Sequence, residues 1–221
     1  MLLTRPDLPT ENAAEIVGQL AHELRQPLSA MEAIVYYLQL TVVDDARTRA
    51  QIETLRQLID QSGSILSDAV HYLQAAPARP EPHDLHEALA ESAGRLATLD
   101  QNLLAFDLAD PFPLLHFDLI QMQHLLGAAL RFCLRASRRA HPVEVTTRVQ
   151  SSRAVLRFTT TAPHLDLLSP DDLFTPFEDH PTAVAGLGLA SIRRIAEAHG
   201  GECRLLTEPG RRLALRIELP I

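Results

Sequence analysis

The chain has 221 residues, of which 46% are hydrophobic and 22% charged, and its formal net charge is −8 at pH 7. This balance is typical of a soluble globular protein with room for one large or two small domains, and it excludes a disordered chain. The acidic charge argues against a nucleic-acid partner, which would require Lys and Arg gathered on one face. The densest basic run is interpreted as the solvated end of a helix; it comprises Arg131, Arg135, Arg138 and Arg139.

Neither a secretory leader nor a membrane anchor is predicted. Prolines interrupt residues 1–10, where a leader would need a continuous apolar stretch, and we interpret this segment as an N-terminal tail. No window approaches the roughly 20 apolar residues that cross a bilayer. Two isolated cysteines, Cys133 and Cys203, favour neither a disulfide framework nor a metal site. The chain is therefore predicted to be cytoplasmic, without a bound metal and without membrane insertion.

Residues 11–74 are predicted to form two long helices. Their apolar residues recur at steps of three and four, which is the pattern of helices that pack along a seam. The connection at residues 43–46 is short, so the helices are expected to run antiparallel. The seam consists of Leu20, Leu24, Leu28, Met31, Val35, Leu38 and Val42 in the first helix, and of Ile52, Leu55, Ile59, Ser62, Leu66, Ala69 and Leu73 in the second.

A lone helical hairpin cannot cover its own apolar stripe. Two hairpins packed together bury both stripes in a four-helix bundle, so a homodimer is predicted. The alternative is that the hairpin packs against the rest of its own chain.

A domain boundary is predicted after the hairpin. Residues 75–83 contain three prolines and show no periodicity, which indicates an extended linker. Residues 84–221 mix helical and strand patterns, so the second domain is predicted to be α+β, with helices on one face of a mixed sheet. The expected helices cover residues 84–100, 118–136 and 187–199, and the expected strands cover residues 102–108, 143–150, 154–160, 202–207 and 212–219.

The stretch LAHELRQPLSA, residues 20–30, carries the most informative chemistry. His22 lies about 200° around the helix from Leu20, so it is expected to point into solvent, opposite the seam. An exposed imidazole is largely neutral and nucleophilic at neutral pH, and Glu23 is placed to hold the Nδ1 proton and leave Nε2 free to attack. Pro27 lacks an N–H, so the helix is expected to loosen or kink there. The alternative is that His22 is an ordinary surface residue.

This motif consists of His22, Glu23, Leu24, Arg25, Pro27 and Leu28. It resembles the H-box of the sensor histidine kinases, whose core is His-Glu-Leu-x-x-Pro-Leu in the first helix of a hairpin. The resemblance implies that His22 is a phosphoacceptor, that Glu23 orients and activates its imidazole, and that Arg25 lies beside them. The residue four after the histidine is often Thr or Asn in that family and positions a hydrolytic water. Here it is Gln26, which argues against the usual phosphatase activity.

The last part of the chain holds two motifs of the same family's ATP-binding domain. Residues 173–178, LFTPFE, resemble its F-box, and residues 186–189, GLGL, with the helix that follows, resemble its G2 box. Gly186 and Gly188 precede a helix, where free backbone N–H groups can bind phosphate. Taken alone, Gly-x-Gly is equally typical of a tight strand-to-helix turn. Together the motifs imply an α/β-sandwich domain of the histidine-kinase ATPase type.

The N-box of that domain departs from the family pattern. Alignment of residues 124–132 places His124 at the first Asn position and Ala128 at the second, whose side chain normally coordinates Mg²⁺. A methyl group offers no oxygen ligand to Mg²⁺, and an imidazole suits softer metals.

The G1 box departs as well. Thr160 stands where an Asp normally accepts the adenine amino proton, and a neutral hydroxyl makes a weaker contact than a carboxylate. Ala162 and His164 replace two glycines that shape the base pocket. Because each lost contact costs about 1–3 kcal/mol, the nucleotide site is predicted to be degenerate and inactive.

Three functions remain open. In the first, the protein is a two-component phosphorelay component: His22 is phosphorylated and exchanges phosphate with Asp residues of response-regulator receiver domains. No cofactor is then required, and an upstream kinase is a further partner. In the second, it is an active sensor histidine kinase that uses Mg-ATP to phosphorylate its own histidine. In the third, it is a non-catalytic pseudokinase that docks its partners. The other histidines lack metal-ligand spacing and are predicted to be surface residues; they are His71, His83, His86, His116, His141, His164 and His180.

Overall fold

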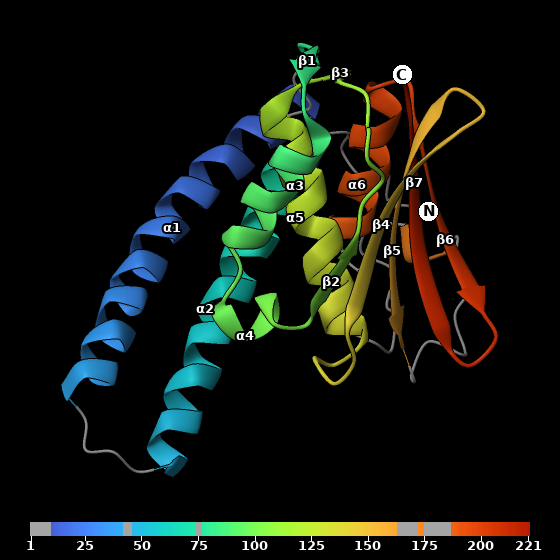
Figure 1. Ribbon diagram of the computed structural model, residues 1–221. Helices are drawn as coiled ribbons and strands as arrows, with labels where there is room; N and C mark the ends of the chain where they lie inside the picture. The colour runs from blue at the N-terminus through green and yellow to red at the C-terminus, as the bar shows by residue number, and fades with distance from the viewer. Residues whose placement is uncertain (1–9, 42–45, 74–76, 163–171, 175–186) are drawn as a thin grey trace, which may run out of the picture. The chain divides into compact units, whose positions relative to one another are not determined.

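The computed structural model divides into two compact units, Met1–Ala75 and Ala76–Ile221. The first is a helical hairpin and the second is a sheet with helices packed on it (Figure 1). Among the helices of the described ranges, none has an apolar run long enough to cross a membrane. The described residues are 10–41, 46–73, 77–162, 172–174 and 187–221.

The hairpin consists of α1 (Thr10–Thr41) and α2 (Ala46–Leu73), which run antiparallel as the short connection predicts. Helix α1 continues without a break through Pro27, where the sequence predicted a loosened or kinked turn. A helix tolerates this proline because only one backbone hydrogen bond, to the carbonyl of residue 23, is lost. A small apolar cluster joins the two helices: Val35, Ile52 and Ile59 are buried, and Leu28 and Leu38 pack against them.

Much of the predicted seam nevertheless stays open to solvent in the chain taken alone. Five seam residues leave 40–50% of their surface exposed, and other large apolar side chains of the hairpin are more exposed still. Burial of one such side chain contributes about 1.5–3 kcal/mol, so this face favours association. The five are Leu20, Leu24, Met31, Leu55 and Leu73; the others are Ile34, Tyr36, Tyr37, Leu40, Leu58 and Ile65. The four-helix bundle stays a prediction.

The second unit is built on a five-stranded sheet in the order β2-β4-β5-β7-β6. Strand β2 runs parallel to β4, and the other neighbours are antiparallel, so the sheet is mixed as predicted. A separate two-stranded sheet pairs β1 with β3. The strands are β1 (Glu81–His83), β2 (Leu104–Asp107), β3 (Leu115–Phe117), β4 (Val143–Gln150), β5 (Arg153–Thr161), β6 (Glu202–Glu208) and β7 (Arg212–Pro220).

Helices α3, α5 and α6 cover one face of this sheet (Figure 1). Strand β7 alternates accordingly, since every second residue from Leu213 to Leu219 is apolar and faces the helices, and Ala154, Leu156 and Phe158 of β5 face them too. Arg157 and Arg216 project from the other face. The helices begin at good N-caps, since the carboxylates of Asp84 and Asp118 accept first-turn N–H groups. The helical elements are α3 (Leu85–Gly94), α4 (Thr98–Gln101), α5 (Leu119–Ala136), the short 3-10 helix η1 (Asp172–Phe174) and α6 (Leu187–Ala198).

Three short elements differ from the prediction. The helix expected over residues 84–100 is divided, because α3 ends at Gly94 and α4 starts only at Thr98. Residues 81–83, assigned to the linker, form β1 and pair with β3, which the sequence did not predict. These strands have three residues each, too few to show a period, and they depend on pairing between distant segments.

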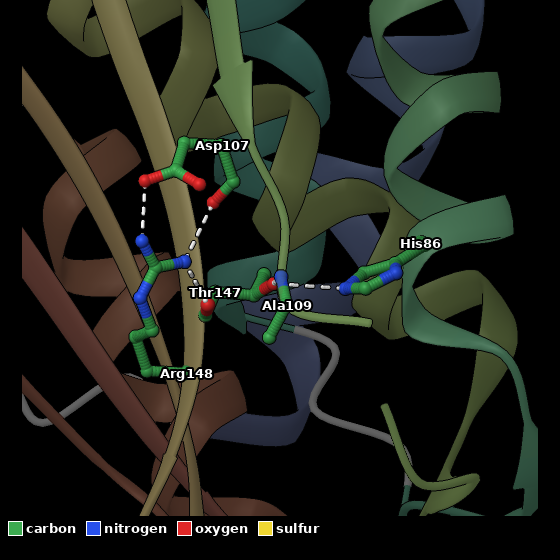
Figure 2. A network of polar contacts seen from close by, with 5 residues as sticks. All are labelled: His86, Asp107, Ala109, Thr147 and Arg148. Atoms are coloured by element: carbon green, nitrogen blue, oxygen red, sulfur yellow. Dashed lines mark hydrogen bonds and ion pairs between the residues drawn. The ribbon is translucent and has the colours of Figure 1, made fainter. Parts of the chain in front are cut away.

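A polar network fixes the connection between β2 and β3 (Figure 2). The Thr147 Oγ1 accepts the backbone N–H of Ala109 at 3.0 Å and lies 2.9 Å from the Nε2 of His86. The His86 ring stacks on Phe112, with the ring centroids 4.6 Å apart. The prediction that His86 is a surface residue is therefore wrong: it is half-buried and joins α3 to β4. Buried polar groups in folded proteins need such partners.

Strand β4 also holds the end of β2 through Arg148, whose side chain projects from the face opposite to that of Thr147. The Arg148 guanidinium donates to the backbone carbonyl of Asp107 at 3.0 Å and forms an ion pair with the Asp107 carboxylate. Because both side chains are largely exposed, solvent weakens this pair. We therefore assign most of the network's energy to the buried hydroxyl of Thr147.

A substitution tests this assignment. Thr147→Val keeps the shape of the side chain but leaves the Ala109 N–H without its acceptor, which we expect to lower the free energy of unfolding by about 1–3 kcal/mol. Urea unfolding followed by circular dichroism measures the change. Thr146→Val is the matched control because its side chain lies on the opposite, open face of β4. Equal unfolding midpoints for the two variants would contradict the assignment.

Candidate functional site

The predicted phosphoacceptor lies on α1. His22 is exposed, and so are Glu23, Arg25, Gln26 and Pro27 beside it, so one accessible stretch of helix carries all five. The proline has no N–H to give to the carbonyl of Glu23, which leaves that carbonyl without its usual helical donor. An exposed imidazole in this setting can be reached by a phosphoryl donor on another protein.

The remaining predicted site residues lie in the second unit around α5 and α6. The contacts between these helices and their ends include two polar ones: Nε2 of His199 accepts the backbone N–H of Asp118 at 3.0 Å, and Nε2 of His124 lies 3.3 Å from Oγ of Ser191. Moving along α5 from residue 118 to 124 means moving back along α6 from 199 to 191, so the helices are antiparallel. This register places Ala128 at the level of the first turn of α6, which contains Gly188.

Ala128 belongs to the hydrophobic core. Its side chain is 2% exposed, and its neighbours Gly127 and Ala129 on α5 are buried too. A methyl group enclosed by apolar side chains supplies no oxygen to a metal ion. The structure thus places the second predicted N-box position where Mg²⁺ cannot be coordinated by the residue present.

Thr160, the predicted G1 residue, has its hydroxyl engaged by the backbone. Its Oγ1 donates to the carbonyl of Pro142 at 2.9 Å, and the residue is 3% exposed. Two residues on, the N–H of Ala162 donates to the carbonyl of Arg211 at 2.9 Å, so this end of β5 is tied to the turn before β7. The position offers a nucleotide base neither a carboxylate nor a free hydroxyl proton.

The F-box and G2 motifs are described only in part. Leu173 and Phe174 of η1 are buried in the core, and the Arg193 guanidinium of α6 lies 3.6 Å from the centroid of the Phe174 ring. Such a cation–π contact fixes η1 against the second turn of α6. Gly188 lies in the first turn of α6. Gly186, residues 175–178 and the histidines at 164 and 180 lie outside the described residues.

His199 is a structural residue that sequence reasoning treated only as part of the G2 motif. Its Nδ1 lies 2.8 Å from the carbonyl of Ile195, which can only accept, so Nδ1 carries the proton. Its Nε2 accepts the N–H of Asp118, so both ring nitrogens have a backbone partner.

Neither a reactive cysteine nor a metal site is found in the described part of the chain. Burial raises the pKa of the Cys133 thiol to about 12, and burial does the same for Cys203, although the nearby Arg193 opposes it. Neither thiol is a nucleophile at neutral pH. Within the ranges that the structure describes, no three His, Cys, Asp or Glu side chains are grouped so that they could hold a metal ion.

Comparison with known proteins shows which family the second unit is similar to. Residues 117–221 match the family described as histidine kinase-, DNA gyrase B-, and HSP90-like ATPase. Over 216 residues the chain is 24% identical to the methanogenesis regulatory histidine kinase FilI of Methanothrix harundinacea (strain 6Ac), which covers 92% of this chain and 24% of FilI. It is 22% identical over 219 residues to the alginate biosynthesis sensor protein KinB of Pseudomonas aeruginosa, which covers 94% of this chain and 37% of KinB. The chain thus spans less than half the length of these relatives.

Solved structures extend the likeness to the hairpin. Full-length ShkA in complex with AMPPNP superposes with a TM-score of 0.62 at 25% identity, covering 94% of this chain and 46% of ShkA. The catalytic domain of the histidine kinase ThkA superposes with a TM-score of 0.58 at 16% identity, covering 64% of this chain and 95% of that domain. The second of these shows the fold alone.

The contribution of the Asp118 carboxylate, which caps α5, to the free energy of unfolding is expected to depend on pH. Burial raises the pKa of Asp118, but backbone N–H donors, led by that of Gln121, lower it by more, and the nearby His199 ring adds to the lowering. The pKa in the folded protein is thus below its ordinary value of 3.8. A carboxylate of lowered pKa stabilises the fold fully above its unfolded pKa, and this contribution is lost as the pH falls through the folded pKa.

We therefore expect the difference in free energy of unfolding between the unmodified chain and Asp118→Asn to be constant from neutral pH to about pH 5, then to shrink as the pH falls further. Urea unfolding at several pH values measures it. A difference that does not change with pH would show that the charge of Asp118 contributes nothing.

Proposed function

Because the chain belongs to the histidine kinase family, we propose that it is a two-component phosphorelay protein. In this proposal His22 accepts a phosphoryl group and exchanges it with an Asp of a response-regulator receiver domain. The observation that carries the proposal concerns two residues of the second unit. This unit keeps the ATPase fold, yet the positions aligned with the Mg²⁺ ligand and the adenine acceptor hold the buried methyl of Ala128 and the backbone-bonded hydroxyl of Thr160.

The residues present do not fit Mg-ATP, so the proposed reaction takes its phosphoryl group from another protein. Neutral imidazole attacks through Nε2, the bond from phosphorus to the aspartyl oxygen breaks, and the carboxylate of the receiver leaves. The new N–P bond places positive charge on the ring of His22. The adjacent Glu23 carboxylate stabilises that charge and holds the Nδ1 proton. The receiver domain supplies the divalent metal that such transfers need.

The proposed assembly is a homodimer. The exposed apolar residues of α1 and α2, among them Leu20, Leu24 and Met31, support it, because a second hairpin would cover them. His22 lies on the same helix, is exposed as well, and is about 200° around the helix from Leu20. Dimer formation and access by a receiver are therefore expected to use different sides of α1.

Phosphoryl transfer from a phosphorylated receiver domain tests the proposal directly. Purified protein mixed with a receiver that carries radioactive phosphate should acquire an acid-labile label, as phosphohistidine is hydrolysed in acid. The label should be absent from His22→Ala and unchanged in His116→Ala, which removes another exposed histidine. Label that survives in His22→Ala, or that never forms on the unmodified chain with any receiver tried, would overturn the proposal.

A second function, an active histidine kinase, is favoured by the match to the ATPase family over residues 117–221. Calorimetric titration with Mg-ATP separates it from the relay. Loss of two contacts worth about 1–3 kcal/mol each corresponds to a loss of about one to four powers of ten in affinity. We expect no binding in the micromolar range and no dependence on Mg²⁺. A micromolar dissociation constant that requires Mg²⁺ would support the kinase and contradict our placement of Ala128 in the ligand position.

A further inference from the structure

Asp118 lies where three segments of the second unit meet. Its Oδ1 accepts the N–H of Gln121 at 3.1 Å and thereby caps α5. Its Oδ2 accepts the backbone N–H of Arg79 at 3.2 Å, from the segment that leads into β1. Its own N–H donates to Nε2 of His199 at 3.0 Å, at the end of α6. One residue thus bonds to a segment 39 positions earlier and to a side chain 81 positions later.

The His199 end of this arrangement is rigid. The ring is 8% exposed, and its proton is directed to the carbonyl of Ile195, so each ring nitrogen already has a partner. Gly201 lies two residues further on, and a Cβ at that position would clash with the carbonyl oxygen of Glu218, so the backbone is packed closely against β7. The last turn of α6 cannot shift without disturbing either the histidine contacts or this packing.

We propose that Asp118 and His199 form a coupling element that ties the position of residues 77–80, where the chain enters the second unit, to helix α6. The chain of contacts runs from the Arg79 N–H through Asp118 and His199 to the carbonyl of Ile195. Helix α6 carries Gly188 in its first turn, so a displacement of the entering segment would change how firmly the helix of the G2 motif is held. This coupling lies wholly within the second unit and stands whether or not His22 is phosphorylated.

Two substitutions at one position separate the two ring contacts. The amide nitrogen of Asn occupies the place of Nδ1, so His199→Asn keeps the contact to Ile195 and loses the one to Asp118. The amide of Gln reaches the place of Nε2, so His199→Gln keeps an acceptor for the Asp118 N–H. Hydrogen exchange of single amides in the full chain, followed by NMR, then reads the effect at Arg79.

We expect the Arg79 amide to exchange about tenfold faster in His199→Asn, as one net hydrogen bond is lost. It should change by less than about threefold in His199→Gln, with amides of β5 and β7 unchanged in both variants. Equal Arg79 exchange in the two variants would overturn the coupling. Uniform acceleration that includes β5 and β7 would also overturn it, since His199 would then act on overall stability alone.

Coupling is reciprocal, so the reverse experiment must agree. Arg79→Pro removes the donated N–H at an exposed position and should speed exchange of the His199 and Gly200 amides several-fold. Arg79→Ala is the matched control, because it removes the side chain and keeps the N–H. If the proline variant leaves the end of α6 unchanged, the entering segment and α6 are independent and the proposal is wrong.

Discussion

The enclosure of α5 is the constraint on which the second unit depends. This helix packs against α3, α6 and the sheet, and most of its residues are buried, including Leu125, Leu126, Leu130 and Phe132. A helix with so wide an apolar surface is stable only when other elements cover it. The fold therefore survives the loss of nucleotide ligands, because the side chains that hold α5 in place are different from those that would hold ATP.

The same constraint explains the chemistry of the candidate site. The methyl group of Ala128 on this helix is buried in the core, and the hydroxyl of Thr160 donates a hydrogen bond to a backbone carbonyl. Both positions contribute to stability in this protein. A polar ligand introduced at residue 128 would leave a polar group in an apolar environment, which costs free energy unless it finds a partner. The proposed relay needs nothing from these positions.

The hairpin has the opposite character. Its internal cluster is small, centred on Val35, Ile52 and Ile59, and much of its apolar surface remains exposed. The second unit thus has its own complete core, whereas the first is expected to gain stability by association. An exposed His22 on such an element suits a phosphoacceptor that must meet other proteins. The coupling element at Asp118 would connect the segment that leaves this hairpin to the helix that carries the G2 motif.

The amino-acid sequence by itself determined the long elements. The period of three and four residues predicted α1, α2, α5 and α6, and alternation predicted β4 to β7, since these patterns are local consequences of which face is buried. The H-box-like stretch around His22 could also be recognised from the sequence, because it is a run of neighbouring residues in one helix.

Only the tertiary structure decided the elements and roles that depend on distant partners. Strands β1 and β3 have three residues each and form because they pair with each other, and the turn that divides α3 from α4 interrupts an apolar pattern that continues past it. His86 finds its partner 61 residues away in Thr147, and His199 finds its own 81 residues away in Asp118. A histidine's tautomer and burial are set by the groups that surround it in space, and sequence spacing does not encode those groups.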